Sequence, residues 1–159
     1  MELHAVGRDE LGRRVHLMFA PDFADINNAP FPDLPFVLLL GGPTQNLPVE
    51  LVYSTIERLL TRGAAYIMCW GEGASRCEDI ADEAAVMSSI DNPHAATILT
   101  TAHDRDALDE VLGFATTVAV PAEPLAERCR DVVLVFHGNV NWYNQAHILL
   151  EDMLRDGAA

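Results

Sequence analysis

The sequence contains no lysine, so its ten cationic residues, histidine aside, are all arginine. A Walker A loop needs a lysine at the terminal phosphates, and Schiff-base or pyridoxal chemistry needs a lysine amine. Both reaction classes are therefore excluded. With 24 Asp and Glu residues the formal net charge is −14. Nucleic acid is therefore not expected as a partner, because phosphate binding depends on clustered cations.

Cysteine and long apolar runs are also scarce. Cys69, Cys77 and Cys129 are an odd number in a chain of 159 residues, so a disulfide framework is not expected. The longest apolar run, residues 36–40, is far shorter than the roughly 20 residues of a membrane-spanning helix. The first ten residues lack a basic-then-apolar secretion signal. We therefore expect a cytoplasmic protein that does not enter a membrane.

Half of the residues are hydrophobic and 21% are charged, which is typical of a folded domain. Four short apolar runs are each followed by a pattern of apolar residues with helical spacing. The runs are residues 36–40, 65–69, 96–101 and 132–136. Continuous apolar runs of this length favour strands that are buried on both faces. Residues 36–159 therefore predict four βα units of an α/β three-layer sandwich, Rossmann-like, with a mainly parallel sheet of four to five strands.

The first 35 residues have a different character, although we assign residues 1–159 to a single domain. Residues 13–20 predict a strand, paired with residues 3–6 as an N-terminal ribbon on the sheet edge. Residues 21–35 contain four prolines, which favours an irregular surface loop. Residues 116–131 fit either a short helix around Leu125 or an extended connection.

Three polar residues are candidate helix caps. Ser75 followed by Glu78 has the spacing of a capping box. Asp104 is a candidate N-cap for a helix with apolar residues from Ala107 onward, and Asn141 for the last helix. The two helices between residues 72 and 110 carry much of the acidity, because ten acids and two arginines give this stretch a net charge of −8. It forms either solvent-facing helix surfaces or a surface for a basic partner protein.

The strand ends define one candidate surface, because ligands of open α/β sheets bind beyond the carboxyl ends of the strands. The glycine turns after the first two runs could hold a phosphate or could serve turn geometry alone. Neither matches the dinucleotide fingerprint G-x-G-x-x-G. The segment 137–145 combines amides with two large aromatic residues, a composition that suits recognition of a planar ligand or a partner. The candidate ligand- or partner-binding residues are Gly41, Gly42, Thr44, Gly71, Arg76, Asn139, Asn141, Trp142 and Tyr143.

Cys77 is the sharpest catalytic candidate, because it lies near the start of a helix, where the dipole favours a thiolate. His103 or His137 would act as its base, and Asp104 or Glu72 would orient that imidazole. The opposing interpretation is a structural cysteine, since Cys77 begins the apolar side of its own helix. The acidic neighbours of Cys77 are also expected to raise the pKa of its thiol.

No metal or cofactor is expected, because the separation of Cys69 and Cys77 is not a zinc spacing. Glu72 and Asp104 could instead form a carboxylate pair. Two functions remain. We favour a non-catalytic acidic α/β binding or regulatory module that recognises a protein partner or small ligand at the strand carboxyl ends. The alternative is a small thiol- or carboxylate-dependent hydrolase or transferase that uses Cys77 with His103 or His137.

Overall fold

The computed structural model describes residues 1–157, apart from the side chains of residues 94 and 155–157. Its strands form one sheet in the order β1-β2-β6-β3-β4-β5, in which β1 is antiparallel to β2 and every other pair is parallel. The strands are β1 (His4–Arg8), β2 (Arg14–Ala20), β3 (Phe36–Gly41), β4 (Ala64–Trp70), β5 (Leu99–His103) and β6 (Asp131–His137). The α/β sandwich with a mainly parallel sheet and an N-terminal edge ribbon is thereby confirmed, and the sheet has six strands in all.

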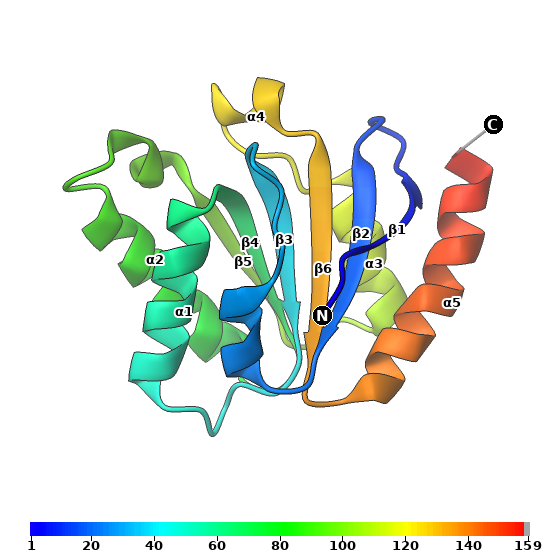
Figure 1. Cartoon of the computed structure of the whole chain (residues 1–159), viewed down its shortest axis with the longest axis horizontal. Coiled ribbons are helices and arrows are strands. Elements are labelled where there is room, and N and C mark those ends of the chain that lie inside the picture. The colour runs from blue at the N-terminus through cyan, green and yellow to red at the C-terminus, as the bar shows by residue number, and fades with distance from the viewer. Residues whose placement is uncertain (158–159) are drawn as a thin grey trace.

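Helices cover both faces of this sheet (Figure 1). One face packs against the 3-10 helix η1 and against α1 and α2, and the other against α3 and α5. The helices are η1 (Phe23–Asn28), α1 (Val49–Thr61), α2 (Ala74–Ser88), η2 (Pro93–Thr97), α3 (Leu108–Thr117), α4 (Leu125–Arg128) and α5 (Val140–Gly157). None of the helices in this described part of the chain is long and apolar enough to cross a membrane.

The apolar runs form strands because the sheet buries both of their faces. Every residue of β3, β4 and β6 is buried. Along β4 the side chains alternate, so that Cys69 joins the core under α1 and α2 while Met68 and Trp70 join the core under α3 and α5. The strand of the third apolar run, β5, begins at Leu99 instead of residue 96, because η2 occupies residues 93–97. Of the two alternatives for residues 116–131, the short helix at Leu125 is the correct one.

The expectation of an irregular surface loop at residues 21–35 was wrong for residues 23–28, which form η1, whereas residues 29–35 have no regular secondary structure. This segment contains η1 and contributes buried side chains, among them Phe23, Ile26 and Phe31, to the core. The Phe31 ring stacks on Phe36 with the ring centroids 5.3 Å apart. The Arg62 guanidinium lies 5.0 Å from the Phe31 centroid and donates hydrogen bonds to two backbone carbonyls of the same segment. Apolar side chains between the prolines therefore anchor the segment to the sheet.

The expected capping box of α2 was also wrong. Gly73, in a left-handed conformation with φ 87°, stands at the N-cap position without a side-chain cap. The Ser75 hydroxyl donates instead to Asp104 Oδ2 at 3.0 Å, and Glu78 accepts from Thr100 Oγ1 at 2.8 Å. Both side chains therefore connect α2 to β5 and to the loop that follows it.

The other two expected caps are displaced along the chain. The N-cap residue of α3 is Ala107, so Asp104 does not start that helix. At α5, the side-chain oxygen of Asn139 accepts from the Asn141 N–H at 3.0 Å, which gives Asn139 the role expected of Asn141.

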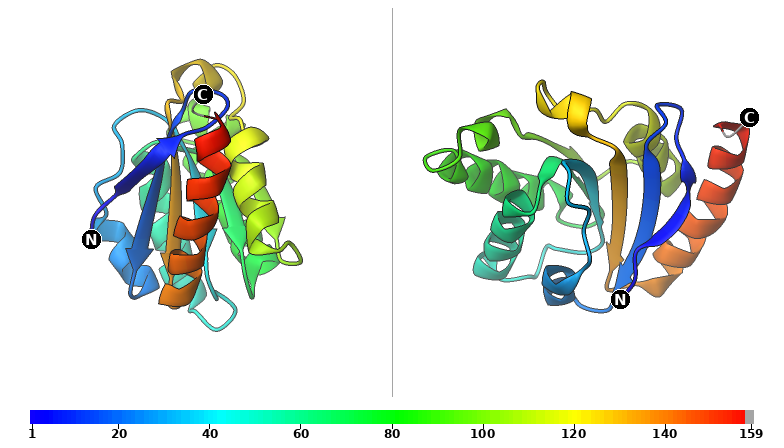
Figure 2. Two further views of the ribbon diagram at one scale, coloured as in Figure 1. Left: turned by 90° about the vertical axis from the view of Figure 1, so that its right-hand side faces the viewer. Right: turned by 45° about the horizontal axis from the view of Figure 1, so that its top comes forward.

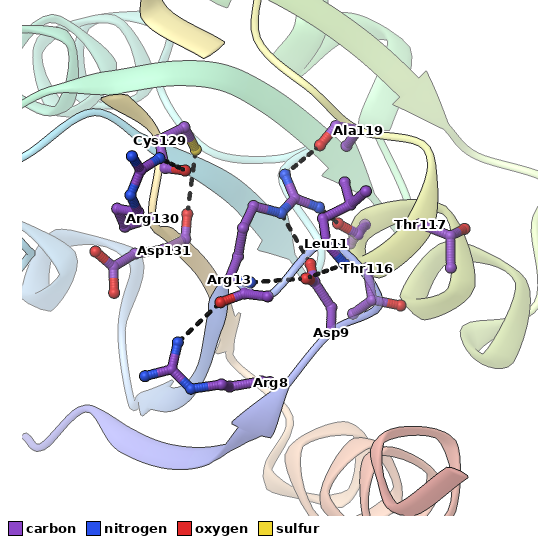
Figure 3. A network of polar contacts seen from close by, with 12 residues as sticks. Arg8, Asp9, Leu11, Arg13, Thr116, Thr117, Ala119, Cys129, Arg130 and Asp131 are labelled. Atoms are coloured by element: carbon purple, nitrogen blue, oxygen red, sulfur yellow. Dashed lines mark hydrogen bonds and ion pairs between the residues drawn. The ribbon is translucent and has the colours of Figure 1, made fainter. Parts of the chain in front are cut away.

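A buried ion pair fastens the β1–β2 ribbon to the rest of the domain (Figure 3). Arg13 Nε donates to Asp9 Oδ2 at 2.8 Å, and the Asp9 carboxylate also accepts from the backbone N–H groups of Leu11 and Arg13. The two remaining guanidinium nitrogens donate to the Ala119 carbonyl at 2.6 Å and the Ala115 carbonyl at 3.2 Å. Arg13 thus satisfies carbonyls at the C-terminal end of α3 that no helical N–H reaches.

We expect Arg13→Met to lower the free energy of unfolding by about 3–5 kcal/mol, because it leaves the Asp9 carboxylate buried without its cation. Urea unfolding followed by circular dichroism measures the change. Arg8→Met is the matched control, since Arg8 lies in the same ribbon, is exposed and donates to the nearby Gly12 carbonyl. Equal losses in the two variants would contradict the assigned role of Arg13.

Candidate functional site

The topology places a switch point between β3 and β6. The two strands are neighbours, yet β3 leads into α1 on one face of the sheet and β6 leads into α5 on the other. The loops that follow β3 and β6 lie at the lower side of the sheet in Figure 1, where the parallel strands end. Such a point, outside the carboxyl ends of the strands, is where open α/β sheets bind ligands.

The glycines predicted at this edge allow neighbouring loops to approach closely. A Cβ on Gly42 would lie 2.6 Å from His137 Nε2, and one on Gly71 would lie 2.9 Å from the Gly42 carbonyl oxygen. A Cβ on Gly41 would lie 2.7 Å from the Phe136 ring. Two N–H groups of the first turn are also engaged, because Gly42 N donates to the Trp70 carbonyl and Thr44 N to the Glu72 carbonyl, at 2.9 Å each. These contacts explain the glycines by close packing of the loops, a reason that differs from both interpretations of the sequence, a phosphate site and turn geometry alone.

Arg76 and Thr44 hold the loop before α1 against the start of α2. The Arg76 guanidinium donates to the carbonyls of Thr44 and Leu47, at 2.8 Å each. The Thr44 hydroxyl donates to the Gly73 carbonyl at 3.1 Å. The cation that the sequence offered as a partner for an anionic ligand is therefore bonded to its own chain.

An open cavity of about 240 Å³ lies between the loops that follow β3 and β4. The lining residues are Pro43, Gln45, Asn46, Leu47 and Glu72. The amides offer donors and acceptors, Glu72 offers a carboxylate, and Pro43 and Leu47 offer apolar contact. Sequence reasoning identified only Glu72 in this set. The polar turn between Gly42 and the first residue of α1 was the available signal for the others.

His137, at the end of β6, is buried beside this edge with 2% of its surface exposed. Its Nε2 has no hydrogen-bond partner in the described structure, and the edge of its ring meets Phe23 with the centroids 5.1 Å apart. Burial lowers the pKa of His137 to about 4, since the charged imidazole would lose its hydration. The side chain is therefore neutral at neutral pH.

His103 lies on the other face of the sheet, against α3. Its Nδ1 lies 2.7 Å from Asp106 Oδ2, and its Nε2 lies 2.8 Å from Thr101 Oγ1. The Phe114 ring of α3 packs on the imidazole at 4.7 Å. Both ring nitrogens of His103 thus have partners, and Asp106, which the sequence did not single out, is the carboxylate beside it.

Cys77 is buried in the first turn of α2, with Cys69 as its neighbour. Hydrogen bonding with Cys69, the nearby Thr44 hydroxyl and the positive charge of Arg76 lower the pKa of Cys77, although burial and Glu78 oppose them. Glu78 thus raises the pKa of Cys77, as expected of an acidic neighbour, but the groups that lower it outweigh this effect. The hydrogen bond with Cys77, together with burial, raises the pKa of Cys69.

The structure does not bring the expected catalytic residues together. Cys77 belongs to the core under α1 and α2, whereas His103 contacts α3 on the opposite face. Within residues 1–157 no hydrogen bond links Cys77 to either histidine, and no group of three or more His, Cys, Asp or Glu side chains could hold a metal ion. Glu72 lines the cavity, while Asp104 accepts from Ser75.

The aromatic residues at the start of α5 pack inward. Trp142 meets Trp70 edge-on with the ring centroids 5.0 Å apart, and Tyr143 lies 6.0 Å from Phe19. Trp70 in turn donates its Nε1–H to the Asp106 carbonyl at 2.9 Å. Trp142 and Tyr143 are half-buried, and Asn141 beside them is exposed.

A family model described as a domain of unknown function (DUF7684) matches residues 16–152, which is most of the chain. The match begins inside β2 and ends inside α5, so it contains the switch point and the cavity. No curated protein matches the sequence.

The buried neutral state of His137 predicts a loss of stability in acid. Between pH 6.5 and pH 4 the unfolded chain binds a proton at this residue and the folded chain does not, so stability falls as the pH falls. The lowered pKa corresponds to about 3 kcal/mol over this range. Urea unfolding at pH 7 and pH 4 should therefore show a smaller pH dependence in His137→Phe, and His4→Phe, at an exposed position, should keep that of the wild type.

Burial predicts that the Cys77 thiol reacts slowly in the native protein despite its lowered pKa. We expect alkylation by iodoacetamide at pH 7.5, followed by peptide mass spectrometry, to proceed at least about a hundredfold faster after unfolding in urea, since a buried thiol reacts only when the structure opens. Rapid native alkylation of Cys77 would support the alternative of a thiol-dependent enzyme.

Proposed function

The chain belongs to the DUF7684 family, and we propose that it is a non-catalytic binding or regulatory module whose ligand docks at the carboxyl edge of the sheet. One observation carries the proposal: the cavity lined by Gln45, Asn46 and Glu72 lies at the strand ends, next to the switch point between β3 and β6. The position supports ligand binding because ligands of open α/β sheets bind beyond the carboxyl ends of the strands, where the loops that lead into α1 and α2 line this cavity.

The lining selects a small ligand that is neutral or cationic. Glu72 is the charged member of the lining, and the nearby Arg76 guanidinium is bonded to the Thr44 and Leu47 carbonyls. The net charge of −14 also repels anions at long range. The volume of about 240 Å³ lies just below the usual range for drug-sized ligands, which favours a small molecule or a single side chain.

The placement of the candidate catalytic groups supports binding over catalysis. His137 is buried, and Cys77 is enclosed in the core under α1 and α2. His103 is hydrogen-bonded to Asp106 on the opposite face of the sheet, beside α3. A general base must come within hydrogen-bond reach of the group that it activates. The alternative of a thiol-dependent enzyme stays a prediction. The lowered pKa of Cys77 favours it, and the alkylation experiment tests it.

Three probes of equal shape and different charge test the ligand class: benzamidine, benzamide and benzoate. In heteronuclear NMR titrations we expect the cationic and the neutral probe to shift the backbone amides of residues 45–47 and 72. Benzoate should leave them unchanged. Glu72→Gln should weaken benzamidine binding about two- to fivefold, the usual effect of an exposed ion pair, and leave benzamide binding unchanged.

Glu127→Gln is the control for this titration, because Glu127 is exposed on α4, away from the cavity, and carries the same charge. It should bind all three probes as the wild type does. A preference for benzoate, or shifts that avoid residues 45–47, would refute the proposed site.

A further inference from the structure

The strand β5 leaves one side of the sheet open. It is the last strand in the sheet order, and among the strands of residues 1–157 it pairs with β4 alone. In the described part of the chain, none of the backbone hydrogen bonds of turns and loops reaches residues 99–103. Every second N–H and C=O along an edge strand points away from the sheet, so β5 presents a row of backbone groups that another strand could pair with.

The two edges of the sheet differ in how they are protected. At the opposite edge β1 is interrupted by a bulge between Ala5 and Gly7, and it packs beside α5 (Figure 2). β5 contains no proline, no glycine and no interruption of its pairing with β4. Bulges and prolines are the usual means of blocking strand addition, and β5 has neither.

Carboxylates line the α2 side of this edge. Ser75, Glu78 and Asp82 follow one another at three- and four-residue steps, so they lie along one side of α2. Glu78 bonds to Thr100 of β5, and Ser75 bonds to Asp104 just beyond it. These two bonds turn that side of α2, with Asp82, toward β5.

Carboxylates also line the α3 side. Asp106 contacts His103 at the end of β5. Glu110 lies one helical turn before Phe114, whose ring packs on the same histidine, so Glu110 is on the side of α3 that faces β5. The cation of this region is Arg105, which is exposed in the turn between β5 and α3.

We propose that the open edge of β5 is the docking site for an extended basic segment of a partner protein, which adds to the sheet as a further parallel or antiparallel strand. Backbone hydrogen bonds to β5 would hold the segment, as in other complexes formed by strand addition. Its Lys and Arg side chains would alternate between the two faces and meet Glu78, Asp82 and Asp104 on one and Asp106 and Glu110 on the other.

The acidic residues beside β5 favour a basic segment over a second copy of this chain as its partner. A second copy of this chain would bring the same acidic helices to the edge, and like charges across such an interface oppose association. A basic segment gains attraction from both flanking helices. This inference is independent of the cavity lined by Gln45, Asn46 and Glu72, because it concerns the edge of the sheet and a different kind of partner.

A capped nine-residue peptide in which pairs of lysines alternate with pairs of valines is the probe, because residues two apart share a face of a strand and this order places lysines on both faces. Added to the isotope-labelled full chain, it should shift the amide signals of residues 99–103 and slow their hydrogen exchange. The same peptide with a methyl group on every backbone nitrogen should bind at least tenfold more weakly, because neither of its edges can then donate backbone hydrogen bonds. A glutamate–valine peptide of equal length should not bind.

Two protein variants separate this site from general attraction between opposite charges. Asp82→Asn combined with Glu110→Gln should weaken peptide binding about two- to twentyfold, as expected for two exposed ion pairs. Glu123→Gln combined with Asp152→Asn removes the same charge at exposed positions on other elements and should change binding less than twofold. Equal weakening by both pairs, equal binding of the N-methylated peptide, shifts away from residues 99–103, or self-association of the free chain through β5 would each refute the proposal.

Discussion

The pairing of β3 with β6 is the constraint on which the rest of the structure depends. The two strands run in register from Phe36 opposite Asp131 to Gly41 opposite Phe136, and all residues of both are buried. Strands covered on both faces admit almost only apolar side chains along their length. Because α1 leaves β3 to one face and α5 leaves β6 to the other, this single pair also creates the switch point at the strand ends.

The two polar residues of β6 stand at its ends, and each meets burial in a different way. Asp131 Oδ1 lies 2.9 Å from Arg14 Nε and 2.8 Å from His16 Nε2. His137 has no such partner at Nε2 and remains neutral instead. The amino end of β6 therefore buries a charge together with its ion-pair partners, whereas the carboxyl end buries an uncharged imidazole.

Much of the fold follows from local sequence, whereas the site depends on distant contacts. Apolar runs such as 132–136 predict buried strands because burial acts on each strand separately. The expected caps failed because Ser75 and Glu78 find their partners, Asp104 and Thr100, more than 20 residues away. The strand-end rule places His103 and Cys77 at one edge of the sheet, but it does not say on which face each side chain lies. The pairing of β4 with β5 aligns His103 with Trp70, which is on the face away from Cys77.

The ion pair of Asp9 with Arg13 affects how the boundary of the domain should be drawn. Both residues precede position 16, where the family match begins, yet Arg13 bonds to carbonyls at the C-terminal end of α3. A fragment cut at the limits of the match would lose β1, expose the outer edge of β2 and leave those carbonyls without their donor. The cooperative folding unit is therefore wider than the stretch of sequence by which the family is identified, and residues 1–15 belong to it.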